Sequence, residues 1–223
     1  MRTSNIPGDT TAAVAVHPTP LGPLVLAATA DALVLCCYGT PETGVARLTR
    51  AGLRTVEEEH ADAGSRAVLA ETRTQLDAYL TGARRDFTVP VDLRLATPFS
   101  RLTVAALDAF VPYGRTATYA QLAAALDRPR AARAVGTALG ANPVCVVLPC
   151  HRIVGSQGSL TGYAGGLAAK QFLLGLESWH DGLTGEREPA ALPTGLTAPE
   201  GLTAPEGLTA PEGLAASTGP TAP

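Results

Sequence analysis

A cysteine, a histidine and an arginine stand in consecutive positions at Cys150, His151 and Arg152, directly after an apolar run that ends at Pro149. A thiol beside an imidazole and a guanidinium lies in a positive field. This field lowers the thiol pKa from about 8.5 and makes the sulfur a stronger nucleophile near neutral pH. The sequence therefore indicates a reactive cysteine at position 150.

Four interpretations of this motif are compatible with the residues alone. The cysteine could simply end a buried strand and do no chemistry. A thiol protease or amidase needs a histidine base and a distant third partner. A metal site needs a further ligand, and His17, His60 and His180 form no ligand pattern with Cys150. The fourth interpretation is transfer of an alkyl group to the sulfur.

The other three cysteines lie within apolar runs of the sequence. Cys36 and Cys37 belong to ALVLCCY, and Cys145 belongs to PVCVVL. The chain contains no CxxC pair, so the pattern favours neither a zinc site nor a disulfide framework. We expect these three residues to be small buried hydrophobic side chains, and all four cysteines to be thiols in a reducing compartment.

Charge is distributed unevenly along the chain. Six acidic residues and one arginine follow His180, so the first 180 residues carry a net charge of +2 although the whole chain carries −3. Between Phe110 and Arg152, five arginines stand against one acidic residue, Asp127. Arginine concentrated beside the reactive cysteine is typical of a surface that faces phosphates.

The length and composition are those of a globular protein. With 223 residues and 46% hydrophobic residues, the chain can build a buried core in one large domain or two small ones. No apolar run approaches the roughly 20 residues of a membrane span, and the N-terminus lacks the pattern of a signal peptide. We therefore expect a cytoplasmic protein that does not associate with membranes.

Residues 1–95 are predicted to form an N-terminal α/β domain. Residues 13–37 alternate in a strand-like way around turn signals and predict a three-stranded meander. Apolar residues at helical spacing predict helices at 41–59 and 66–80. The run DFTVPVDLRL, at 86–95, predicts a short strand.

Residues 96–180 are predicted to form a second, α-rich domain. Thr97 followed by proline predicts the start of an amphipathic helix that ends before Pro112. A buried strand is expected to end at Leu148 just before the cysteine motif, and a last helix at 167–176. The glycine-rich loop between motif and helix would allow its backbone to approach a ligand closely.

Two short helices within this domain predict a helix-turn-helix. Thr118 and Gln121 have the spacing of a capping box and start a helix that runs through Leu126, while a second helix is expected at 129–140. One stripe of the second helix is small and apolar, as packing requires. The polar stripe holds Arg130, Arg133 and Thr137.

Residues 181–223 form a third segment, in which GLTAPE repeats three times in succession. A short repeat rich in proline, glycine and threonine cannot assemble a core, so the segment is predicted to be disordered and to have no catalytic part.

From about Pro98 to Glu177 the sequence closely resembles the O6-alkylguanine-DNA alkyltransferases, also called methylated-DNA–protein-cysteine methyltransferases. PCHR followed by a GYAGG loop, with RAVG and NP upstream at this spacing, carries the resemblance. Residues 13–95 are only weakly similar, with PLGPLVLAA the best match, and the tail is not similar. The resemblance implies a ribonuclease-H-like N-terminal domain and a winged helix-turn-helix-like C-terminal domain.

The resemblance implies a direct, irreversible, single-turnover transfer of a methyl or larger alkyl group to Cys150. The donor would be O6-alkylguanine in DNA and, more weakly, O4-alkylthymine. His151 would deprotonate the thiol through a water, and Glu177 would orient that histidine. Asn142 would brace the turn. Tyr119 would donate a proton to the departing guanine, which is a poor leaving group as an anion.

The resemblance also implies double-stranded DNA as the partner, with the helix that carries Arg133 in the minor groove. Arg133 would fill the gap left when the damaged base rotates out of the duplex. The DNA-binding residues would be Arg133, Arg130, Thr137, Arg115 and Ala132. The base pocket would be lined by Val147, Tyr163, Ala164, Gly165 and Lys170.

The family pattern and this sequence differ in places. Ala164 stands where many relatives have serine, so a pocket hydrogen bond there would have to come from the backbone amide. The N-terminal zinc ligands of some relatives have no counterpart here, and we expect a monomer with no cofactor and no metal. Two other functions stay open: a lesion-binding module, whose known examples replace the cysteine, and a thiol hydrolase, which would turn over many times.

Overall fold

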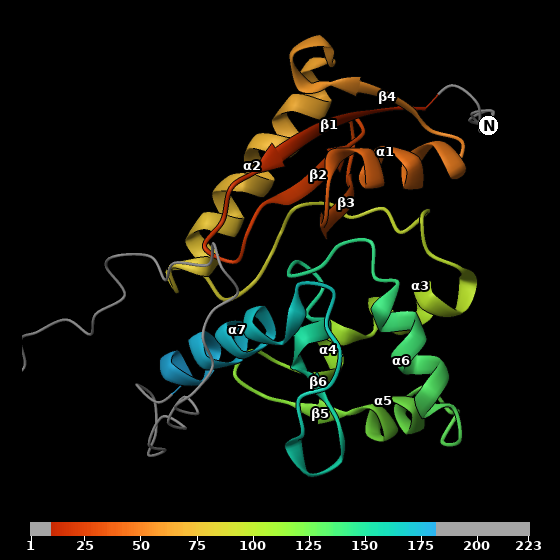
Figure 1. Cartoon of the computed structure of the whole chain (residues 1–223), viewed down its shortest axis with the longest axis vertical. Helices are drawn as coiled ribbons and strands as arrows, with labels where there is room; N and C mark the ends of the chain where they lie inside the picture. The colour runs from red at the N-terminus through yellow and green to blue at the C-terminus, as the bar shows by residue number, and fades with distance from the viewer. Residues whose placement is uncertain (1–9, 182–223) are drawn as a thin grey trace, which may run out of the picture.

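The computed structural model describes residues 10–181, and Figure 1 shows this part of the chain in colour. The predicted GLTAPE tail therefore lies outside the described residues. The sheet occupies one end of the molecule and the C-terminal helices the other (Figure 1). Within residues 10–181, no helix combines the length and the apolar character that crossing a membrane requires.

The N-terminal sheet has four strands in the order β3-β2-β1-β4. The first three are β1 (Thr11–His17), β2 (Leu24–Ala28) and β3 (Leu33–Tyr38), and they pair antiparallel as the predicted meander. All five residues of β2 are buried, because this strand lies inside the sheet and is covered on both faces.

The fourth strand corrects the prediction of a helix at 41–59. Helix α1 (Pro41–Arg50) ends before Gly52, and β4 (Arg54–Glu57) then pairs parallel with β1. Gly52 has φ of 80°, a conformation that ends a helix and that glycine adopts without strain. The predicted helix at 66–80 is confirmed as α2 (Ala63–Leu80), which begins at the N-cap Asp62.

The prediction of a strand at 86–95 is also wrong. In this segment only Val91 forms a β-bridge, with Leu33, through hydrogen bonds from Leu33 N to Pro90 O and from Asp92 N to Leu33 O. Pro90 has no N–H and cannot donate to a ladder, so the pairing with β3 does not extend. The segment instead runs as an extended connection between the two halves of the molecule (Figure 1).

The C-terminal half is helical, with one small parallel sheet. Its N-cap at Thr97 and its capping box at Thr118 and Gln121 are both present, as predicted. The predicted amphipathic helix is divided at Ala106 into two helices. The helices are α3 (Pro98–Ala105), α4 (Leu107–Phe110), α5 (Tyr119–Ala125), α6 (Ala132–Gly140) and α7 (Gly166–Asp181). The short elements of this half are β5 (Ala117–Thr118), β6 (Ile153–Val154) and the 3-10 turns η2 (Cys150–Arg152) and η3 (Ser156–Gly158). The turn η1 (Glu58–His60) belongs to the N-terminal half, between β4 and α2.

Two predicted elements of this half have other bounds or another form. The helix predicted at 129–140 begins at Ala132, because a turn closed by the bond from Ala131 N to Arg128 O precedes it. The buried strand predicted to end at Leu148 is a folded-back loop, in which Val146 has φ of 70°. A β-branched residue rarely adopts this conformation, so the loop is held under backbone strain beside the cysteine motif.

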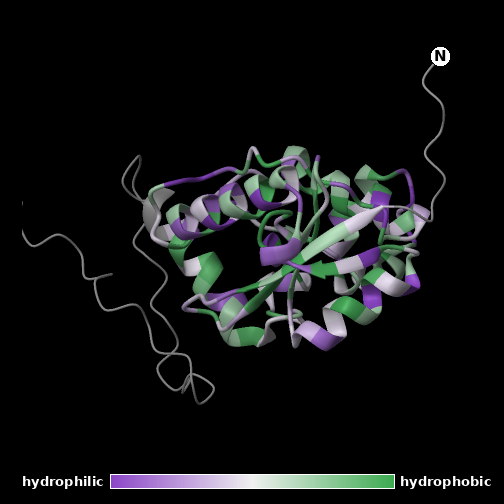
Figure 2. Cartoon of the chain, turned by 90° about the horizontal axis from the view of Figure 1, so that it is seen from above, coloured by the Kyte–Doolittle hydropathy of each residue, from purple (hydrophilic) through white to green (hydrophobic). Residues whose placement is uncertain are grey.

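The main apolar core contains residues from both halves of the chain. Leu26 from β2 and Leu76 from α2 belong to the same buried cluster as Val144 and as Leu173 from α7. Segments of opposite hydropathy alternate along the helical ribbons, as expected of helices with one face on a core (Figure 2). The two halves therefore meet through packed side chains, and α7 is anchored against the N-terminal sheet and helix.

Candidate active site around Cys150

Cys150 begins the turn η2 and is 6% exposed. Its backbone N–H donates to Leu148 O at 2.8 Å, so the preceding loop fixes the position of the thiol. Cys150 lies on the wall of a pocket of about 280 Å³. The sulfur thus belongs to a site that can accept a small organic group.

Asn142 lies in the loop that leads to the cysteine and bonds to two of its backbone groups. Its side-chain amide donates to Leu148 O at 3.1 Å, and its carbonyl oxygen accepts from Val144 N at 3.0 Å. The residue is 2% exposed. A single buried amide therefore ties together both ends of the strained turn around Val146.

The pKa of the Cys150 thiol is lowered from its ordinary value. The largest cause is the neighbouring side chain of Cys145, while burial opposes the shift and Asn142 and the positive charge of Lys170 assist it. Each of these groups stabilises the thiolate more than the thiol. The thiolate, which is the nucleophilic form, therefore forms more readily here than in an ordinary cysteine.

His151 and Glu177 form a buried hydrogen-bonded pair. His151 Nε2 lies 2.7 Å from Glu177 Oε1, and the side chains are 0% and 1% exposed. Because an ionised carboxylate only accepts hydrogen bonds, Nε2 carries the proton in this pair. Within the described residues, His151 Nδ1 has no hydrogen-bond partner although it is buried, so Nδ1 is left to act as a base.

Glu177 accepts hydrogen bonds from four groups around it. Besides His151, Arg152 donates through Nε at 2.9 Å to Oε2, Gly114 N donates to Oε2 at 3.0 Å, and the hydroxyl of Tyr79 donates to Oε1. Burial raises the pKa of Glu177, but the hydrogen bonds and the charges of His151 and Arg152 outweigh it and hold that pKa at about 2. The carboxylate is ionised at neutral pH.

Three of these groups were not assigned a role from the sequence. Arg152 was visible in the motif only as a source of positive field, yet its guanidinium is 4% exposed and also donates to Val111 O at 2.9 Å. Tyr79 stood among the apolar positions of a predicted helix, and Cys145 within an apolar run. Spacing in the sequence could not reveal these contacts. Tyr79 and Glu177 are 98 positions apart, and Cys145 and Cys150 are five positions apart without forming a recognisable motif.

The pocket contains two of the five predicted pocket residues. Tyr163 and Ala164 line it. Val147, Gly165 and Lys170 do not: Val147 is buried, and Gly165 packs so closely on the ring of Tyr38 that a Cβ atom would lie 2.5 Å from it. The remaining lining comes from Tyr119, Gly136, Leu139, Gly140, Cys150 and Gly162.

Lys170 supports the pocket from behind. Its side chain is fully buried, and Nζ donates to Ile153 O at 2.6 Å and to Thr161 O at 3.1 Å. These two bonds join helix α7 to the strand after the cysteine motif and to the loop that forms the pocket wall. The ammonium also lies 6.0 Å from the centre of the Tyr119 ring, a cation–π distance.

Tyr119 shares the pocket with Cys150 and starts helix α5. Its phenol oxygen accepts a hydrogen bond from the Thr161 hydroxyl at 3.0 Å. Because the oxygen accepts this bond, the phenol proton remains available to a group in the pocket. Tyr119 and Cys150 therefore both line the cavity, and the tyrosine hydroxyl keeps a proton that it can donate.

The residues predicted to bind DNA lie on or near helix α6. Arg133 and Thr137 are exposed on it, and the Thr137 hydroxyl donates to Arg133 O at 3.2 Å. Ala132 is its first residue, whereas Arg130 is exposed in the preceding turn and is not on the helix as predicted. Arg115 is exposed after the turn at Gly114. Helices α5 and α6 lie beside each other in the arrangement expected of a helix-turn-helix (Figure 1).

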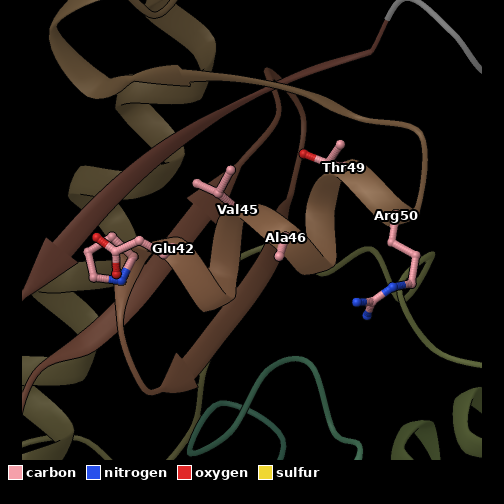
Figure 3. A pocket seen from close by; sticks show the side chains of 6 residues that line it. Glu42, Val45, Ala46, Thr49 and Arg50 are labelled. Carbon is pink, nitrogen blue, oxygen red and sulfur yellow. The ribbon is translucent and has the colours of Figure 1, made fainter.

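A second pocket, of about 640 Å³, lies along helix α1 (Figure 3). Its lining residues are Pro41, Glu42, Val45, Ala46, Thr49 and Arg50. None of them is a nucleophile, and none belongs to the cluster around Cys150. The described residues hold one group with the spacing of a metal site, the exposed Glu57, Glu59 and His60, which shares no residue with either pocket.

Two family models match the chain. Residues 98–179 match the 6-O-methylguanine DNA methyltransferase DNA binding domain, and residues 14–93 match the ribonuclease-like domain of the same proteins. The predicted fold class, a ribonuclease-H-like α/β part followed by an α-rich DNA-binding part, is confirmed.

Known methylated-DNA–protein-cysteine methyltransferases are similar to the chain. Those of Mycolicibacterium paratuberculosis and Bacillus subtilis, the latter the inducible protein, are each 48% identical to it. The alignments cover 48% and 46% of this chain and 63% and 56% of those proteins, less than two thirds of their length. The protein of Methanosarcina acetivorans is 35% identical over 73% of this chain and 96% of its own.

Solved structures agree with these sequence comparisons. The crystal structure of Mycobacterium tuberculosis OGT in complex with DNA is 34% identical to the chain, with a TM-score of 0.61 over 76% of this chain and 94% of that one. The crystal structure of the O6-methylguanine methyltransferase from the same organism has the same identity and TM-score. With both family models matched in order and a relative aligned over nearly its whole length, the chain belongs to the 6-O-methylguanine DNA methyltransferase family.

Proposed function

We propose that this protein repairs DNA by moving a methyl or other alkyl group from O6-alkylguanine, and more weakly from O4-alkylthymine, onto the sulfur of Cys150. The observation that carries the proposal is the placement of one activated thiol in a pocket that also holds a proton donor. Cys150 and Tyr119 line the same cavity of about 280 Å³, close to the lower end of the range for small-molecule sites.

The proposed reaction is a displacement at the alkyl carbon. The Cys150 thiol loses its proton to His151 Nδ1 through a water, and Glu177 stabilises the imidazolium. The thiolate attacks the alkyl carbon, a carbon–sulfur bond forms, and the carbon–oxygen bond breaks with its electron pair moving into the guanine. Tyr119 supplies the proton that neutralises the guanine, so the leaving group departs without charge.

The proposed transfer is irreversible, because a thioether is not cleaved under cellular conditions. Each protein molecule therefore acts once. Cys145, Asn142 and Lys170 contribute by favouring the thiolate, and Lys170 also holds the loop that forms the pocket wall.

The proposed partner is double-stranded DNA, and the similar Mycobacterium tuberculosis OGT structure is a complex with DNA. Chemistry on a base atom inside a duplex requires the base to leave the stack. Helix α6 presents Arg133 and small residues next to the pocket residues Gly136 and Gly140. We infer that this helix enters the minor groove and that Arg133 takes the place of the extruded base, with Arg130, Arg115, Thr137 and Ala132 along the same surface.

The two parts of the chain have different roles in this proposal. We propose that residues 96–180 hold the catalytic and DNA-binding residues, and that residues 1–95 form a supporting domain that packs against them through the shared core. We further infer that the protein acts as a monomer, since one chain supplies every group that the reaction needs. We also infer that it acts in the cytoplasm, where a reducing environment keeps the Cys150 thiol free.

Mass spectrometry after incubation with duplex DNA containing O6-methylguanine tests the proposal. One added methyl group on the peptide that contains Cys150, in a yield of one per protein molecule, is the expected result. Unchanged protein mass with tight DNA binding would instead indicate a lesion-binding module, and an unchanged mass without binding would leave a hydrolase. The variant Cys150→Ser is the control and should take up no methyl group while still binding DNA.

A further inference from the structure

Tyr79 brings a hydroxyl group from the N-terminal half of the chain into the site. It lies near the end of helix α2 and is completely buried. Its ring packs against Phe87 at a centroid distance of 5.0 Å and edge-on to Tyr113 at 6.1 Å. These contacts fix the ring, so the hydroxyl has one well-defined position.

The Tyr79 hydroxyl contacts both members of the buried pair. It donates to Glu177 Oε1, and its oxygen lies 3.3 Å from His151 Nε2. Oε1 therefore accepts from Tyr79 and from His151, and Oε2 accepts from Gly114 N. Arg152 Nε donates to both oxygens, at 2.9 Å to Oε2 and 3.1 Å to Oε1. The hydroxyl and the imidazole share one carboxylate oxygen.

We propose that Tyr79 is a positioning residue for alkyl transfer: its hydroxyl holds Glu177 Oε1 against His151 Nε2 and limits the negative charge that this oxygen offers to the imidazole. This inference rests on the proposed function and extends it, because it assigns a part in the reaction to the N-terminal half. Tyr79 does not touch the pocket and acts only through Glu177 and His151.

The effect of the hydroxyl has a definite sign. Burial lowers the pKa of His151, and the bond and charge of Glu177 raise it. The Tyr79 hydroxyl is a further donor on Oε1, beside His151 and Arg152. It draws negative charge away from the imidazole, so it keeps the histidine neutral to lower pH. Besides Tyr79 from α2, the titratable and charged groups that face His151 are Glu177 and Lys170 from α7, Arg152 and Cys150 from η2, and Tyr163 from the loop before α7.

The variant Tyr79→Phe removes the hydroxyl and keeps the ring contacts. We expect the histidine to protonate at higher pH in this variant, because Oε1 then attracts the imidazolium more strongly. The rate of benzyl transfer from free O6-benzylguanine to Cys150 should fall roughly two- to tenfold near pH 6, the size of one hydrogen bond, and should stay unchanged near pH 8.5. The matched control is Thr72→Val, which removes another buried hydroxyl from the same helix, bonded only to Val68 O.

A second measurement does not depend on alkyl transfer. Titration of the His151 imidazole by NMR should give a higher pKa in Tyr79→Phe than in the wild type and no change in Thr72→Val. If wild-type protein accepts no alkyl group, the proposed function fails while this titration still tests the contact. If the wild type reacts, a loss that is equal at all pH values, an unchanged rate, or an unmoved His151 titration would overturn the role of Tyr79.

Discussion

Replacing Glu177 with glutamine should remove a pH-dependent part of the free energy of unfolding. The folded protein lowers the pKa of this carboxyl from its ordinary value of 4.5 to about 2. The carboxylate is buried and accepts hydrogen bonds from His151, Arg152, Gly114 and Tyr79. The folded state therefore stabilises the ionised form of this carboxyl group more than the unfolded chain does.

The magnitude follows from this difference in pKa. At 1.36 kcal/mol per unit, the ionised carboxylate contributes about 3 kcal/mol to stability at pH 7. A group whose pKa is lowered by folding stabilises fully above the unfolded pKa and loses that contribution as the pH falls toward the folded value. By pH 3, about 2 kcal/mol of the contribution should be lost.

Urea unfolding of the wild type and of Glu177→Gln between pH 7 and pH 3 measures this contribution. Other acidic groups titrate in both proteins and cancel in the difference between them. The stability advantage of the wild type should shrink by about 2 kcal/mol over this range. Two curves that remain parallel from pH 7 to pH 3 would refute the assignment of a charged, hydrogen-bonded Glu177.

Three further changes test other parts of the site. Arg133→Ala should slow repair of duplex DNA more than reaction with free O6-benzylguanine, because the arginine is exposed on α6; equal losses in both assays would argue against its role in base extrusion. Cys145→Ala should raise the pKa of the Cys150 thiol, measured as thiolate absorbance against pH, and an unmoved curve would exclude a contribution of Cys145 to the lowered pKa. Lys170→Met should lower the free energy of unfolding by about 2–4 kcal/mol, because the buried carbonyl of Ile153 and the carbonyl of Thr161 lose a charged donor. An unchanged urea midpoint would contradict the last prediction.

The sequence predicted those parts of the fold that depend on local patterns. The three-stranded meander and the caps at Thr97 and Thr118 follow from alternation and from side chains that bond within three residues. Strand β4 could not be predicted in the same way. Only Val56 within it is apolar, and its pairing with β1 joins segments more than 40 positions apart.

The site was predictable where the chemistry is consecutive in sequence. Cys150 and His151 stand in one motif, and the resemblance supplied Glu177, Asn142 and Tyr119, which the structure places around them. Their catalytic roles remain predictions.

The surroundings of the site depend on how distant segments pack. Tyr79 reaches Glu177 across 98 positions, and Lys170 lies behind the pocket wall rather than in it. Such contacts are decided by tertiary packing, to which no local pattern in the sequence corresponds.

The shared apolar core has a consequence for how the molecule melts. Leu26 and Leu76 pack in the same cluster as Val144 and Leu173, and Cys36 bridges to Val144 by backbone bonds. A fragment severed near residue 96 would expose part of that cluster to water on each piece. The polypeptide should therefore denature in a single cooperative transition, and neither piece alone should retain the stability it has within the intact chain.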